Sequence, residues 1–168
     1  LGSKMATKVL DAGHSLKVYD RDPHAVEKLV AVGASGVRSV QEVASHIDVL
    51  MTCLPSPAIC AEVMSGSGGA LEMLTAGSCW IEMSTTDVDE MKRLATLAQE
   101  RGVDVLECPA TGGVHRAARG EMTLLAGGNE TVFERYRPLL EIMSGQIVYM
   151  GEIGNASLIK VVTNLLCL

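Results

Sequence analysis

The sequence is poor in aromatic residues, basic clusters and long apolar runs, and each shortage excludes something. Aromatic residues make up 3% of the 168 residues, so the hydrophobic core must be built from aliphatic side chains and methionine. The formal net charge is −6 and no basic cluster is present, which argues against a nucleic-acid partner. The apolar runs are far shorter than a membrane span, so we expect no membrane partner either.

The cysteines and histidines lack the spacings that mark redox or metal motifs. The five cysteines (Cys53, Cys60, Cys79, Cys108 and Cys167) form no CxxC pair and lie mostly inside apolar runs. This pattern is typical of buried free thiols in a reducing compartment, and predicts the cytoplasm, or an organelle matrix in a eukaryote. The four histidines show no ligand spacing, so we expect no metal site. No secretory signal is present, although the chain does not begin with Met.

What the sequence does contain is a regular alternation of strand and helix patterns, in a length that fits one domain. Apolar spacing predicts helices over residues 5–12, 23–32, 40–44, 59–64, 88–98, 132–143 and from 156 onward. Strands are predicted over residues 16–19, 47–53, 79–83, 103–106, 122–126 and 147–150. The near-continuous apolar run 47–53 is typical of a strand buried on both faces, and Thr86 with Asp89 predicts a capping box. This alternation indicates an α/β domain with a mostly parallel sheet.

Polar, small or glycine- and proline-bearing residues follow several of the predicted strands. These strand ends are Asp20-Arg21, Leu54-Pro55-Ser56, Ser84-Thr85-Thr86 and residues 107–113. In open parallel sheets, ligands bind beyond the carboxyl ends of the strands. The row of strand ends therefore predicts a binding crevice along one edge of the sheet.

Asp20 is the most interpretable of these residues. An acidic residue at the end of a second strand, about 20 residues after a glycine turn, accepts hydrogen bonds from the ribose hydroxyls of NAD. Gly2 fits the third glycine of such a turn, which places the first strand and two leading glycines upstream of Leu1. The alternative for Asp20 is a solvated strand end or a cap for the helix at Pro23. Arg21 would pair with a 2′-phosphate and favour NADP.

Two further clusters have the chemistry of a substrate site. Lys160 and Asn164 lie four residues apart on the last predicted helix and share one face, so a lysine acid/base and an amide could meet one substrate oxygen. The alternative is a lysine that extends to water from a half-exposed helix. Thr111, Gly112 and Gly113 combine a hydroxyl with glycines that admit a ligand close to the backbone, or form a flexible turn.

Five segments, in this order, resemble the β-hydroxyacid dehydrogenase family, which includes 3-hydroxyisobutyrate dehydrogenase, tartronate semialdehyde reductase and the 6-phosphogluconate dehydrogenases. They are MATKVLDAGHSLKVYDRDP, MTCLPSPA, WIEMSTT, ECPATGGVHRAARGEMTLLAGG and GEIGNASLIKVVTN. The resemblance extends over essentially the whole chain. It implies a Rossmann-like NAD(P)-binding domain over residues 1–153, with helices on both faces of the sheet and its first strand missing. Residues 154–168 would begin an interdomain helix that leads to an absent all-helical domain.

The resemblance also implies an activity and a set of site residues. The reaction is reversible hydride transfer between NAD(P) and a small 3-hydroxy acid or its semialdehyde, with this chain a fragment and the full-length protein a homo-oligomer. The resemblance assigns catalysis to Lys160, Asn164 and Thr111, and substrate binding to Thr111, Gly112 and Gly113. It assigns cofactor binding to Gly2, Asp20, Arg21, Leu54, Pro55 and Thr85. Asp20 favours NAD over NADP.

The sequence departs from the family pattern at two positions of the substrate segment. Thr111 stands where a serine is usual, and Arg116 stands where a small residue is common. The first keeps the hydroxyl but adds a methyl group, and the second either contacts a carboxylate or faces water. The alternative function is a truncated, non-catalytic dinucleotide-fold protein that binds a nucleotide weakly or acts as a scaffold.

Overall fold

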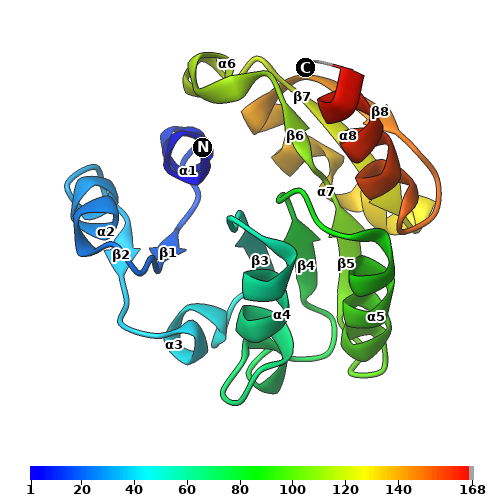
Figure 1. Ribbon diagram of the computed structural model, residues 1–168. Coiled ribbons are helices and arrows are strands. Elements are labelled where there is room, and N and C mark those ends of the chain that lie inside the picture. Colours follow the sequence, from blue (N-terminus) through cyan, green and yellow to red (C-terminus); the bar gives the residue numbers. More distant parts are fainter. Residues whose placement is uncertain (167–168) are drawn as a thin grey trace.

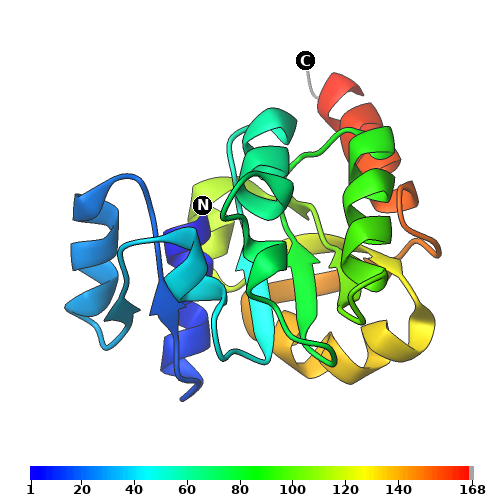
Figure 2. The same ribbon diagram turned by 90° about the horizontal axis from the view of Figure 1, so that it is seen from below.

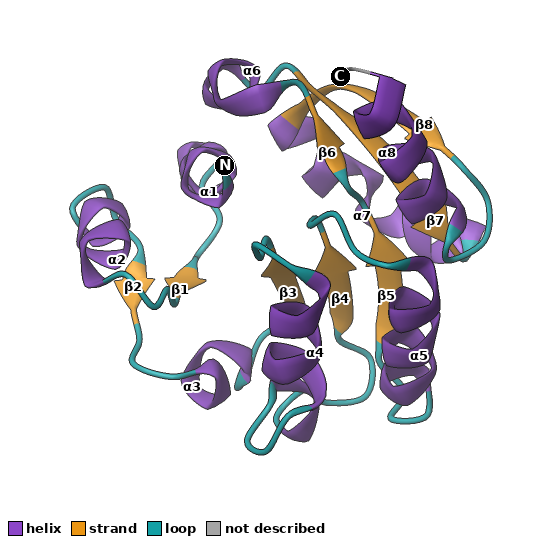
Figure 3. Cartoon of the chain, viewed as in Figure 1, coloured by secondary structure: helices purple, strands orange, loops and turns teal. Residues whose placement is uncertain are grey.

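The computed structural model describes residues 1–166, and these residues form an α/β fold (Figures 1 and 3). The helices are α1 (Gly2–Asp11), α2 (Pro23–Val30), α3 (Val40–Ala44), α4 (Pro57–Ser65), α5 (Val88–Gln99), α6 (Gly113–Arg119), α7 (Glu130–Met143) and α8 (Asn155–Leu166), with a 3-10 helix η1 (Ala70–Glu72). The strands are β1 (Lys17–Val18), β2 (Ser35–Gly36), β3 (Val49–Thr52), β4 (Cys79–Glu82), β5 (Asp104–Glu107), β6 (Ala110–Thr111), β7 (Met122–Gly128) and β8 (Ser144–Tyr149).

The strands form two separate sheets. The larger has six strands in the order β3-β4-β5-β7-β6, with β8 beside β7. Its first three strands are parallel, and their register places Thr52, Glu82 and Glu107 side by side at the carboxyl ends. Strand β7 runs antiparallel to β5 and β6, and parallel to β8. Strands β1 and β2 form a small parallel pair of their own. The predicted Rossmann-like α/β fold is confirmed, with a mixed sheet.

Helices lie on both faces of the larger sheet (Figure 2), and two apolar clusters of side chains lie beneath them. Ile81 and Leu106 face one cluster, to which α1 and α7 contribute, while Trp80 and Val105 face the other, under α4 and α5. The side chains of β4 are buried on both faces because β4 is an interior strand of the sheet. The expected arrangement of helices on both faces is therefore present.

The prediction that the strand at residues 47–53 is buried on both faces is wrong. Strand β3 is shorter, and only Leu50 and Thr52 are buried, whereas Val49 and Met51 are half-buried. The reason is its place in the fold: β3 pairs with β4 on one side only and lies at the edge of the described sheet. Its other edge borders the pocket described below.

Two smaller expectations also need correction. Asp87, not Thr86, caps α5, because the Asp87 carboxylate accepts from the backbone N–H groups of Asp89 and Glu90. The Thr86 hydroxyl is buried and makes no hydrogen bond to the described residues. Cys53 is exposed, whereas Cys60, Cys79 and Cys108 are buried as expected; Cys167 lies outside the described residues. Among residues 1–166, no helix is long and apolar enough to cross a membrane.

Candidate functional site

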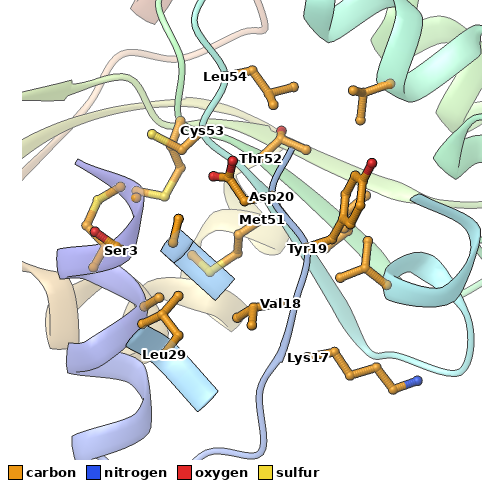
Figure 4. Close-up of a pocket in the computed structure, with 18 of the residues that line it drawn as sticks. Ser3, Lys17, Val18, Tyr19, Asp20, Leu29, Met51, Thr52, Cys53 and Leu54 are labelled. Carbon is orange, nitrogen blue, oxygen red and sulfur yellow. The ribbon is translucent and has the colours of Figure 1, made fainter. Parts of the chain in front are cut away.

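A largely apolar cavity of about 430 Å³ lies between the two sheets (Figure 4). Strand β1 and helix α2 form one wall, β3 and α4 the opposite wall, and α1 closes one side. Five of the six predicted cofactor residues line this cavity: Gly2, Asp20, Arg21, Leu54 and Pro55. The tertiary structure thus brings together loops that lie far apart in the sequence.

Asp20 lines this cavity together with Thr52, Cys53 and Leu54 (Figure 4). Its Oδ1 accepts from the backbone N–H of Asp22 at 2.9 Å, which shapes the turn into α2. The cap of α2 is Asp22 itself, whose carboxylate accepts from the N–H of His24. The alternative of Asp20 as the helix cap is therefore wrong, whereas its side chain is exposed, as a solvated strand end would be, and lines the cavity.

The loop after β3 is held in place from the neighbouring strand. The N–H of Leu54 donates to the buried hydroxyl of Ser84 at 2.7 Å. The N–H of Ser84 in turn donates to Oε1 of Glu82 at 2.6 Å. The Leu54-Pro55 wall of the cavity is therefore fixed to the loop that follows β4.

Gly2 lines the cavity without needing to be glycine, and Thr85 lies outside the cavity lining. A side chain at Gly2 would place a Cβ 3.4 Å from the Cβ of Cys53, an ordinary contact, so the described residues do not require glycine there. Thr85 is exposed and is not among the residues that line the cavity. It lies on the same sheet edge, between the buried residues Ser84 and Thr86.

Lys160 and Thr111 meet in a second part of the site. The Lys160 side chain is 9% exposed, and its Nζ donates to the Thr111 hydroxyl at 3.1 Å. Lys160 projects from α8, and Thr111 ends β6, so residues separated by 49 positions meet. The alternative of a lysine that extends into water is wrong for this structure. Asn164 lies one turn further along α8 and is exposed.

The two glycines after Thr111 form the turn into α6. Both have positive φ, 132° at Gly112 and 72° at Gly113, which side chains rarely adopt. A Cβ at Gly112 would lie 2.9 Å from Cδ of Arg116, so the stem of Arg116 packs against this glycine. The turn therefore exposes backbone beside the Thr111 hydroxyl, to which Lys160 Nζ donates, and beside the stem of Arg116, a set of groups that suits a carboxylate.

Sequence reasoning missed two buried glutamates under this edge of the sheet. Glu82 is 1% exposed, and its Oε2 accepts from the Thr52 hydroxyl at 2.5 Å and from the Cys60 thiol at 3.0 Å. Burial, and then the Glu82 charge, raise the pKa of the Cys60 thiol, so Cys60 stays protonated and donates. The Trp80 indole N–H completes the network by donating to Thr52 Oγ1 at 2.8 Å.

The second missed residue is Glu107, which is fully buried. Its carboxylate accepts hydrogen bonds from backbone and side-chain donors at the start of α8. The sequence held one signal for both residues, namely an acid at the last position of an otherwise buried strand. Within the described residues, no group of three or more His, Cys, Asp or Glu is arranged to hold a metal ion.

The fold and the row of strand-end loops define a dinucleotide-binding α/β domain. The model of the NAD-binding domain of 6-phosphogluconate dehydrogenase matches residues 1–151. The chain therefore belongs to the β-hydroxyacid dehydrogenase family, as the sequence motifs predicted, and the cofactor is NAD or NADP.

Curated relatives agree with this assignment. A 2-(hydroxymethyl)glutarate dehydrogenase of Eubacterium barkeri is 33% identical over 99% of this chain and 55% of its own length. The mitochondrial 3-hydroxyisobutyrate dehydrogenase of Mus musculus is 34% identical over 99% of this chain and 50% of its own. The chain thus spans about half the length of the curated relatives it matches.

Solved structures share the fold over nearly the whole chain. The 3-hydroxyisobutyrate dehydrogenase of Mycobacterium tuberculosis with L-serine has a TM-score of 0.91 and 30% identity, covering 99% of this chain and 56% of that one. Psf3 in complex with NADP+ and 2-OPP has a TM-score of 0.93 over 98% of this chain and 58% of that one. At 24% identity, the second likeness shows the fold alone.

Proposed function

We propose that this chain is the cofactor domain of an NAD(P)-dependent dehydrogenase of the 3-hydroxyisobutyrate type. The reaction is reversible hydride transfer between NAD(P) and a small 3-hydroxy acid or its semialdehyde. The observation that carries the proposal is the 3.1 Å hydrogen bond between the buried Lys160 and Thr111, beside an exposed diglycine turn. A buried amine within reach of a ligand oxygen is the arrangement that a general acid/base requires.

The cavity fits the adenosine half of the cofactor. Asp20 and Arg21 would meet the ribose and any 2′-phosphate, and the Leu54-Pro55 wall would pack against the adenine ring. Thr85, further along the same sheet edge, would contact the nicotinamide side. When bound, NAD(P) supplies the hydride chemistry: it accepts hydride from the substrate carbon that bears the hydroxyl, or returns hydride to that carbon.

The residues around Lys160 would bind the substrate and move its proton. The hydroxyl of Thr111 and the backbone at Gly112 and Gly113 would hold the carboxylate, with Arg116 as a neighbouring cation. Lys160, as the neutral amine, would take the proton of the substrate hydroxyl during oxidation and return it during reduction. Asn164, on the same face of α8, would hold the same oxygen.

Named relatives support the finer parts of the proposal. Dehydrogenases of 3-hydroxyisobutyrate and of 2-(hydroxymethyl)glutarate both act on hydroxy acids, which makes a small hydroxy acid the expected substrate class. Mitochondrial and bacterial relatives fit a cytoplasmic or matrix location. We further propose the domain division at residues 153 and 154, which falls next to the start of α8 at Asn155, and a homo-oligomeric full-length protein.

Cofactor binding can be followed through the single tryptophan. Trp80 is fully buried, and its indole N–H bonds to Thr52, which lines the cavity, so a bound reduced cofactor would quench its emission by energy transfer. We expect saturable quenching by NADH and by NADPH at micromolar concentrations, with NADH the tighter ligand. A folded chain whose emission neither cofactor changes would contradict the proposal.

Catalysis is tested by Lys160→Met, with Lys28→Met as the matched control on the exposed surface of α2. With NAD+ and 3-hydroxyisobutyrate as probes, we expect NADH formation to fall about 10²- to 10⁴-fold for Lys160→Met and to stay unchanged for the control. Cofactor quenching should survive in both. Equal activity of the two variants would remove Lys160 from the mechanism.

One observation favours the alternative, a nucleotide-binding chain without catalysis. Within residues 1–166, no backbone hydrogen bond joins β1 to β3, and the cavity between them is open. Quenching by NADH without any turnover of the probe would favour this alternative over the dehydrogenase.

A further inference from the structure

We propose that Glu107 is the positioning residue for Lys160: its buried carboxylate fixes the start of α8 so that the lysine meets Thr111. This inference rests on the proposed function for its catalytic meaning, but the geometry on which it stands is independent of it. The Glu107 carboxylate binds donors at the start of α8, so we assign it a role through the helix rather than at the reacting atoms.

The carboxylate replaces a local helix cap. Oε1 accepts from the N–H of Gly154 at 2.6 Å and of Ala156 at 3.0 Å. Oε2 accepts from the N–H of Ser157 at 3.2 Å and from its hydroxyl at 2.5 Å. The first N–H groups of a helix have no partner within the helix, and here a side chain about 50 positions earlier supplies it. The negative charge also lies at the positive end of the α8 dipole.

The surrounding backbone is shaped to admit this carboxylate. A Cβ at Gly127 would lie 2.5 Å from Glu107 Oε1, so only glycine leaves room for it on β7. Gly154 has φ 102°, a conformation that side chains rarely adopt, and this turn points its N–H at the carboxylate. A fully buried charge is costly unless its hydrogen bonds are complete, which holds Glu107 to this one arrangement.

Glu107 and the catalytic contact join the same two segments. Along the chain, Glu107 and Thr111 are four residues apart, at the end of β5 and in β6. Along α8, Ser157 and Lys160 are three residues apart and therefore share a face. The hydrogen bonds of Glu107 fix the start of α8, and the hydrogen bond between Lys160 and Thr111 requires α8 to have a particular rotation. Loss of the Glu107 hydrogen bonds should therefore let α8 shift and should break the contact between Lys160 and Thr111.

Glu82 offers a matched control. It is the register partner of Glu107 on β4 and is equally buried, so both variants remove one buried charge from the same sheet edge. Its hydrogen bonds go to Thr52, Cys60 and Ser84, and none goes to α8. A general loss of stability should therefore appear in both Glu107→Gln and Glu82→Gln, whereas displacement of Lys160 should appear in Glu107→Gln alone.

The experiment is a ¹³Cε–¹Hε correlation spectrum of the chain labelled at lysine. Lys160 is the one lysine classed as buried among residues 1–166, so its methylene protons should be inequivalent and its signal distinct; Lys160→Met assigns it. We expect Glu107→Gln to move this signal toward the position of the exposed lysines, and Thr111→Val to shift it because the variant removes a hydrogen-bond acceptor of Lys160. Ser157→Ala, which removes one of the four donors, should move it part of the way. Glu82→Gln should leave it in place.

Three results would overturn the proposal. The first is an unchanged Lys160 signal in Glu107→Gln, and the second is an equal shift in Glu82→Gln. The third, should Glu107→Gln fail to fold, is an unchanged signal in Ser157→Ala. The spectrum needs neither cofactor nor substrate. A failed dehydrogenase assay with the expected shifts would therefore reject the proposed activity and leave the positioning role intact.

Discussion

The region that contains the cavity and the region that holds Lys160 are built differently. On the cavity side, β1 and β2 are two residues long, their partners are each other, and Asp20 and Arg21 are exposed. On the lysine side, six strands are joined in one sheet, and Lys160, Glu82 and Glu107 are buried. Figure 1 shows β1 and β2 set apart from the larger sheet, and residues of both β1 and β3 line the cavity.

The two regions differ in the contacts that position their site residues. On the cavity side, the turn that follows β1 is held by local contacts, such as that of Asp20 with the N–H of Asp22. Residues of the lysine side are placed by long-range hydrogen bonds to buried carboxylates, such as Glu107 to α8. We expect substitutions on the cavity side to weaken ligand binding while the fold is kept. Substitutions on the lysine side should destabilise the fold first.

The largest expected effect is on stability, and it is tested by one leucine-to-alanine substitution in each region. Leu106→Ala removes a fully buried side chain of β5 and should lower the free energy of unfolding by about 2–5 kcal/mol. Leu16→Ala removes a half-buried side chain that lines the cavity and should cost less than about 1 kcal/mol. Urea denaturation with an unchanged m-value measures both. Equal losses would mean that the cavity wall is packed as firmly as the sheet.

The next effect is on cofactor selectivity. Asp20→Ala should weaken NADH binding about 10- to 150-fold, since a hydrogen bond to a charged group contributes about 1.5–3 kcal/mol, and should leave NADPH binding nearly unchanged. Arg21→Ala should weaken NADPH instead. Trp80 quenching measures both affinities. Asp22→Ala is the control, because it removes the α2 cap without lining the cavity. If that variant lost NADH affinity equally, the effect of Asp20 would be structural.

The smallest effect is on thiol reactivity, measured in a Cys167→Ser background because Cys167 lies outside the described residues. Cys53 is exposed, yet desolvation of its sulfur raises its pKa, so its reaction with a disulfide reagent should be slow near neutral pH and accelerate as the pH rises and thiolate forms.

The buried cysteines should behave differently. Burial raises the pKa of Cys79 to about 12 and also raises that of Cys108, so these thiols should react only after unfolding. Cys53→Ser should abolish the thiol reaction of the folded chain, and NADH should slow that reaction because Cys53 lines the cavity. A second thiol that reacts in the folded chain at the rate of Cys53 would show that the lysine side opens as readily as the cavity side.

The spacing of apolar residues along the chain was sufficient to predict most helices and strands, because this spacing involves only residues close together in the sequence. The apolar spacing of α5 and the run Cys79–Glu82 predicted a helix and a strand at nearly the observed bounds. The short segments β6 and α6 carry no comparable period and were not predicted as elements. The cap of α5 was misplaced by one residue, since Asp87 is a charged acceptor that the Thr86 hydroxyl does not displace.

By itself, the sequence determined the α/β class, the row of strand ends and the family, because periodicity and ordered motifs are properties of neighbouring residues. Only the tertiary structure decided that β3 lies at an edge, that Lys160 is buried against Thr111, and that Glu107 holds α8. The physical reason is that burial and hydrogen bonding of a charge depend on residues far away in the chain. A glutamate that ends a strand has the same local pattern whether it faces water or the start of a helix 47 residues later.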